Sequence, residues 1–159
     1  MKFIGDGMTG KVSRWLRILG HDVKYESTAS DYELLNIAVE EQRILLTRDK
    51  ELFQRAQALS VRGFFLEKPK LEEKLADLAQ RFKIKLDVDI TNSRCPICGS
   101  HLNRVAQKEA SNKAPKNSLK HFKEFWLCIK CDKLYWQGTH WKNINQTLNK
   151  AKRLLIDRK

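Results

Sequence analysis

The chain has 159 residues, enough for one ordinary domain or for a small domain with a compact appendage. Apolar residues make up 42% of the sequence and charged residues 31%, which excludes a chain that is disordered throughout. The net charge of +12 is uneven: residues 1–90 hold 16 Lys and Arg against 15 Asp and Glu, whereas residues 91–159 hold 15 against 4.

The first 82 residues alternate between strand and helix patterns. Short apolar runs predict strands, and apolar residues at helical spacing predict helices. The predicted strands are residues 2–5, 22–25, 43–47 and 63–66. The predicted helices are residues 9–19, a segment that begins at the Ser30–Glu33 capping box, residues 50–59 and residues 70–82. Four such alternations with short links predict an α/β fold whose parallel sheet is covered by helices on both faces.

The helical period is lost at residues 85–93, so we place a boundary there between two units, residues 1–89 and 90–159. In the second unit, a polar and basic insert at 108–123 is expected to be mobile. Apolar spacing over 143–156 predicts a basic C-terminal helix.

All four cysteines lie in the second unit, as the pairs Cys95–Cys98 and Cys128–Cys131. Two C-x-x-C pairs at this spacing are typical of a zinc ribbon, which would occupy about residues 94–137. Two disulfides or a redox pair are the alternatives, but a reducing compartment disfavours disulfides and a redox motif needs no second copy. Since four protein ligands leave no open position, the zinc would be structural.

Acidic residues follow the ends of the predicted strands. Asp6 ends the first strand, Asp49 follows the third, and Asp31 begins the helix after the second. Because ligands of open parallel sheets bind beyond the carboxyl ends of the strands, these three acids predict a site for Mg²⁺ or Mn²⁺. The alternatives are that Asp49 caps the helix that follows it, and that Asp31 is an acid that suits the dipole of its helix.

Basic residues lie close to these acids. Lys11, Arg14 and Arg17 recur every third residue and predict a basic stripe that binds a phosphate backbone, unless it is only a solvated helix face. Arg48 would either neutralise the acids or bind a phosphate.

The excess positive charge of the second unit indicates binding to phosphates, with a solubilising charge run as the alternative. Trp136, His140 and Trp141, together with Trp126 and Tyr135, are candidates for stacking on the bases of a nucleic acid. The alternative for these aromatic residues is that they pack the small core of the ribbon.

Five segments carry a family resemblance: MKFIGDGMTGKVSRWLRILGHDV, SDYELLNIAVEE, RILLTRDKEL, SRCPICGSHLNRV and FWLCIKCDKLYWQGTHW. In their order and residues they resemble the Mut-7 C-terminal RNase domain family, a PIN-like nuclease domain with a C-terminal zinc ribbon. The resemblance implies metal-dependent ribonuclease activity, with Asp6, Asp31 and Asp49 at the acidic positions. PIN-like sites usually carry a fourth acid, for which Glu51 and Glu67 are the candidates.

We therefore expect a metal-dependent ribonuclease whose zinc ribbon binds RNA. The alternative is a non-catalytic RNA- or ribosome-binding module that keeps the PIN-like fold. With no apolar run long enough for a bilayer and no signal-peptide pattern at the N-terminus, we expect no membrane contact and a cytoplasmic location.

Overall fold

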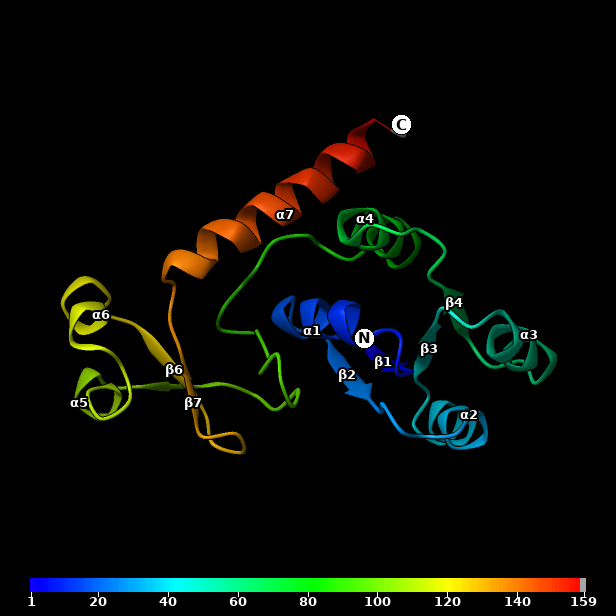
Figure 1. Ribbon diagram of the computed structural model, residues 1–159, viewed down its shortest axis with the longest axis horizontal. Helices are drawn as coiled ribbons and strands as arrows, with labels where there is room; N and C mark the ends of the chain where they lie inside the picture. The colour runs from blue at the N-terminus through cyan, green and yellow to red at the C-terminus, as the bar shows by residue number, and fades with distance from the viewer. Residues whose placement is uncertain (158–159) are drawn as a thin grey trace.

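A computed structural model describes residues 1–157 and contains two sheets (Figure 1). The larger sheet is parallel, as predicted, with the strand order β2-β1-β3-β4. Its strands are β1 (Lys2–Gly5), β2 (Asp22–Tyr25), β3 (Ile44–Thr47) and β4 (Gly63–Phe65). All four predicted strands are present, within one residue at each end. The two central strands, β1 and β3, carry Asp6 and Asp49 beyond the same edge.

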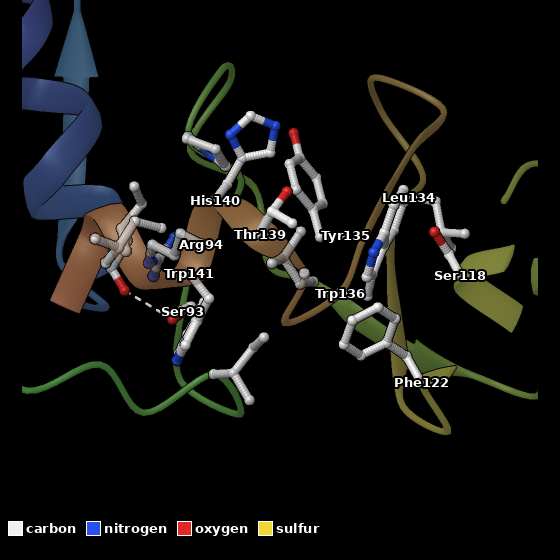
Figure 2. Close-up of a pocket in the computed structure, with 16 residues that line it drawn as sticks. Ser93, Arg94, Ser118, Phe122, Leu134, Tyr135, Trp136, Thr139, His140 and Trp141 are labelled. Atoms are coloured by element: carbon white, nitrogen blue, oxygen red, sulfur yellow. Dashed lines mark hydrogen bonds between the residues drawn. The ribbon is translucent and has the colours of Figure 1, made fainter. Parts of the chain in front are cut away.

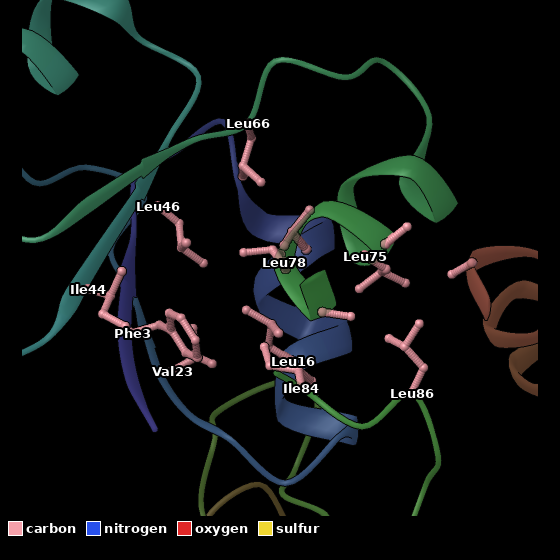
Figure 3. Packing of buried hydrophobic residues seen from close by; sticks show 14 of the residues in the cluster. Phe3, Leu16, Val23, Ile44, Leu46, Leu66, Leu75, Leu78, Ile84 and Leu86 are labelled. Carbon is pink, nitrogen blue, oxygen red and sulfur yellow. The ribbon is translucent and has the colours of Figure 1, made fainter. Parts of the chain in front are cut away.

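Helices cover both faces of this sheet, as the apolar alternation along β1 requires. Phe3 packs with apolar residues of α1 and α4 (Figure 3), whereas Ile4 packs with those of α2 and α3 on the opposite face. These helices are α1 (Gly10–Ile18), α2 (Asp31–Glu40), α3 (Lys50–Ala58) and α4 (Leu71–Phe82). The predicted capping box opens α2, where the Ser30 amide donates to Glu33 Oε2 at 2.7 Å and the Glu33 amide donates to Ser30 Oγ at 3.3 Å.

The second sheet is a small antiparallel ribbon. It consists of β5 (Asn103–Val105), β6 (Phe125–Cys128) and β7 (Lys133–Tyr135) in sequence order. The insert that we expected to be mobile instead forms two short helices, α5 (Gln107–Ala110) and α6 (Lys116–His121). Their formation has a physical reason: Ala110 and Ala114 are buried against Phe125, so this polar segment still supplies an apolar core.

The C-terminal helix α7 (Thr139–Ile156) begins four residues earlier than predicted. It runs from the ribbon to α4, against which it packs (Figure 1). Leu148 and Ala151 are buried in the same apolar cluster as Phe3 and Leu75. Helix α7 therefore comes from residues 90–159 but packs on residues 1–89. The predicted division of the chain into these two units stays a proposal. Residues 158 and 159 of that range lie outside the described residues.

None of the helices within residues 1–157 is both long and apolar enough to cross a bilayer.

Candidate active site and metal centre

Asp6 lies directly beyond β1 and is only 6% exposed. Its Oδ2 accepts a hydrogen bond from Thr47 Oγ1 at 2.5 Å, and its Oδ1 accepts one from the Met8 amide at 2.8 Å. The turn is tight on its other side, since a Cβ at Gly5 would lie 2.2 Å from Thr9 Oγ1. Asp6 is therefore a buried carboxylate held in one orientation by the last residue of β3 and by the turn that follows β1.

Asp49 meets the same threonine. Its amide donates to Thr47 Oγ1 at 2.9 Å, so one hydroxyl group joins the segments that carry Asp6 and Asp49. Asp49 Oδ1 also accepts from the amides of Glu51 at 2.8 Å and Leu52 at 3.2 Å. The helix-cap interpretation of Asp49 is therefore confirmed, and it occupies only one of the two carboxylate oxygens.

Asp31 is held elsewhere, in an ion pair with α3. Its Oδ2 lies 3.0 Å from Arg55 Nη1. Within residues 1–157, the only group of three or more His, Cys, Asp or Glu side chains whose ligand atoms gather closely is the set of four cysteines. The structure thus joins Asp6 and Asp49 through Thr47, but it does not gather the three acids into one set of metal ligands.

The two candidates for a fourth acid are both exposed. Glu51 lies in the first turn of α3, 3.9 Å from Arg55 Nη2, with its side chain 82% exposed. Glu67 follows β4, and its amide donates to the Phe65 carbonyl at 3.1 Å. Neither belongs to a cluster of ligand atoms.

Three cations lie near one another at the edge where Asp6 lies. The pKa of the Lys74 amine is lowered, first by partial burial and then by the positive charges of Arg48 and Lys11. Lys11 is in the first turn of α1, Arg48 follows β3, and Lys74 is in the first turn of α4. None of the three forms an ion pair within residues 1–157, so their charge is free for an anionic ligand. Sequence reasoning missed Lys74, which reads as an ordinary polar position of an amphipathic helix.

Arg17 does not belong to the predicted basic stripe. It is 5% exposed, and its guanidinium donates to the Val23 carbonyl at 2.8 and 2.9 Å and to the Ile97 carbonyl at 2.7 Å. A spacing of three residues falls about 60° short of a full helical turn at each step, so Arg17 points well away from Lys11. Lys11 and Arg14 are exposed, whereas Arg17 joins α1 to the first cysteine pair.

The four cysteines form a compact set, with all ligand atoms within 4.8 Å of one another. The Cys98 and Cys128 sulfurs are 3.5 Å apart, and those of Cys95 and Cys131 are 4.0 Å apart. Tetrahedral zinc with Zn–S bonds of about 2.3 Å places its sulfur ligands about 3.8 Å apart. The thiols therefore fit a metal ion such as zinc.

Local geometry supports this centre. Although burial opposes ionisation of Cys98, hydrogen bonds from Ser100 and the neighbouring thiols lower its pKa to about 6. Gly99 follows the first pair with φ = 79°, and Asp132 follows the second with φ = 53°. Aspartate tolerates this left-handed conformation better than most residues, which explains how it stands where such turns often carry glycine.

Two of the aromatic candidates pack within the ribbon, as the packing alternative predicts. Trp126 is 3% exposed, and Trp136 packs on the ribbon core with its ring centroid 6.1 Å from that of Phe125. Trp136 also lines, together with His140 and Trp141, one pocket of about 360 Å³ between the ribbon, the junction and the start of α7 (Figure 2).

A family model described as the Mut7-C RNAse domain matches residues 1–148. None of the curated proteins and none of the solved structures matches the chain.

Proposed function

The chain belongs to the Mut7-C RNAse domain family, and on that premise we propose that it is a metal-dependent ribonuclease that hydrolyses RNA phosphodiester bonds. One observation carries the proposal: Asp6 is buried and oriented by Thr47 at the sheet edge where Asp49 and three cations without ion-pair partners also lie. Carboxylates with free cations beside them suit a substrate that is itself a polyanion.

Asp6 and Asp49 are the proposed ligands of a Mg²⁺ or Mn²⁺ ion. Mg²⁺ is usually held by one or two carboxylates together with substrate phosphates, so these two acids fit it without a third. Asp31, also proposed as a ligand and catalytic residue, would join them only after it leaves Arg55. When bound, such an ion lowers the pKa of water and stabilises the oxygens of an in-line displacement.

The chain's own residues would position the substrate. Thr47 holds the Asp6 carboxylate through its hydroxyl, and Asp6 cannot turn away because the Met8 amide holds its other oxygen. Lys11, Arg48 and Lys74 would bind the phosphates on either side of the bond that is cut, since nothing within residues 1–157 neutralises them. Arg14 extends this basic surface along α1.

The ribbon is the proposed RNA-binding unit, through its excess of Lys and Arg and through Trp136, His140 and Trp141. A structural zinc ion on the four cysteines would fix its fold, since metal binding is folding free energy for such small units. We also propose a cytoplasmic location, where a reducing environment keeps the four thiols available as ligands.

The test is incubation of the purified full-length protein with labelled single-stranded and structured RNA in Mg²⁺, Mn²⁺ or EDTA, with the zinc content checked afterwards. We expect cleavage that requires the added ion. Asp6→Asn and Asp49→Asn should each abolish cleavage and leave RNA affinity nearly unchanged, because they remove ion ligands and no basic residue. Asp87→Asn is the matched control, since that carboxylate is exposed and pairs with Lys152 on α7. Cleavage at the unaltered rate by both active-site variants would reject this site.

A non-catalytic RNA- or ribosome-binding module is the second candidate. The observation that favours it is that the three acids do not form a set of metal ligands within residues 1–157. RNA binding without cleavage in any of the three ion conditions would select this function.

A further inference from the structure

The pocket beside the ribbon has the composition of a ligand site. It encloses about 360 Å³, within the range of roughly 300–1,000 Å³ that small-molecule pockets occupy. Its walls are mainly aromatic and aliphatic (Figure 2). In this view Trp136 and Phe122 lie on one side of the pocket, and Trp141 and Arg94 lie on the other. Flat rings and a guanidinium on opposite walls suit a flat ring between them.

The polar groups of the pocket are of two kinds. Tyr135 and Ser93 are already bonded, with the Tyr135 hydroxyl 3.3 Å from Cys95 Sγ and the Ser93 hydroxyl donating to the Ile18 carbonyl at 2.7 Å. By contrast, the side chains of Ser118, Thr139 and His140 have no hydrogen-bond partner within residues 1–157. Three unused donors and acceptors at an apolar pocket would fix the orientation of a ligand with a polar edge.

One cation, Arg94, lines the pocket itself. Lys116 and Lys120 lie two residues from Ser118 on α6, and residues two apart on a helix do not share a face, so these exposed lysines are not part of the lining. A ligand with a flat aromatic ring and a polar edge meets the features of the pocket.

We propose that this pocket binds one unstacked base of a single-stranded RNA, between Trp136 and Trp141. This proposal rests on the proposed RNA-directed function and adds to it a specific base-binding subsite. Thr139 and His140 would contact the polar edge of the base, which makes them the residues that discriminate between bases. Duplex RNA cannot use the pocket, because its bases are stacked and paired.

The position of the pocket predicts how RNA would cross the protein. Helix α1 begins beside Asp6, where Thr9 Oγ1 donates to the Asp6 carbonyl at 2.9 Å, and it ends at Ile18, which lines the pocket. The two ends of this nine-residue helix are about 12 Å apart. The base in the pocket would therefore belong to a nucleotide some distance along the strand from the bond that is cut, and would set the register of cleavage.

The test is equilibrium binding by fluorescence anisotropy, with the full-length protein in zinc-containing buffer without added Mg²⁺ or Mn²⁺. Two short probes are compared: a labelled single-stranded RNA, and a ribose-phosphate strand of equal length that lacks bases. Trp141→Ala should weaken binding of the RNA by about 5- to 100-fold, the usual effect of removing one stacking partner. It should change binding of the base-free strand by less than about twofold.

Two variants serve as matched controls. Trp141→Phe should restore most of the affinity, because a phenyl ring still stacks. Tyr32→Ala removes an aromatic ring that is 73% exposed on α2, outside the pocket, and should change neither affinity. Equal weakening for both strands in Trp141→Ala, or no weakening for either, would overturn the base-binding proposal and leave ribonuclease activity standing. If the unaltered protein binds neither strand, both the base-binding proposal and the RNA-directed function fail.

A second measurement uses the unaltered protein, so it does not depend on whether a variant folds. RNA that carries a photoreactive uridine is crosslinked to the unaltered protein, and the modified residues are located by mass spectrometry. Crosslinks at Trp136, Trp141 or their neighbours in the pocket support the proposal. Crosslinks confined to residues outside the pocket contradict it.

Discussion

The packing of α7 on α4 predicts a large effect for one substitution far from any site. Leu148 is 2% exposed, and it lies in the cluster that also contains Leu75 and Phe3. Leu148→Ala removes this side chain from a core that the sheet, α4 and α7 build together. If α7 belonged energetically to the ribbon alone, the sheet would not respond to this change.

The expected magnitude follows from burial. Complete burial of a leucine side chain contributes about 1.5–3 kcal/mol by transfer, and the cavity left behind adds to the loss. Leucine-to-alanine changes in cores cost about 2–5 kcal/mol, depending on how far the site collapses. Since α7 covers α4 from outside and can settle inward, we expect about 3 kcal/mol.

The assay is urea unfolding followed by far-ultraviolet circular dichroism, at constant zinc concentration. Ile156→Ala is the matched control on the same helix, because Ile156 is 68% exposed, and it should change the free energy of unfolding by less than about 0.5 kcal/mol. A loss below about 1 kcal/mol for Leu148→Ala, equal to that of the control, would refute the argument that α7 completes the core.

Three further predictions concern buried groups and the metal centre. Arg17→Ala should destabilise the protein by about 2–4 kcal/mol in urea unfolding, because buried carbonyls lose their donors, whereas exposed Arg14→Ala should change it by less than about 0.5 kcal/mol; similar values for the two would contradict the structure. Cys128→Ser should lower the zinc content in elemental analysis and speed amide exchange in the ribbon, and full zinc retention would count against a four-thiolate centre. Burial, helped by the N-terminal charge and Arg94, lowers the pKa of His21 from 6.5 to about 4. The contribution of neutral His21 to the free energy of unfolding is thus complete above pH 6.5 and is lost as the pH falls toward 4. At pH 5.5 the loss is at most about 1 kcal/mol after allowance for solvent screening. Urea unfolding above pH 6.5 and at pH 5.5 should show this loss in the unaltered protein and not in His21→Gln. Equal pH dependence of the two proteins would exclude His21 as the cause.

Much of the fold was predictable because its signals are local. The strands of the larger sheet, the capping box at Ser30 and the spacing of the cysteine pairs each depend on residues that are close in the sequence. The prediction that Asp6 and Asp49 lie beyond strand ends at one edge of the sheet is also confirmed, since parallel strands carry their carboxyl ends to one edge.

The tertiary structure alone decided which polar residues remain free. Arg17 resembles Lys11 and Arg14 in the sequence, but its guanidinium donates to the carbonyl of Ile97, which lies within the first cysteine pair. Asp31 has the same chemistry as Asp6, yet Arg55 of the neighbouring helix α3 binds it. Local patterns determine where backbone hydrogen bonds form, whereas the partners of a long charged side chain depend on segments that only packing brings together. For the same reason, the sequence shows that α7 is amphipathic, and only the folded chain shows that α4 is the surface its apolar face covers.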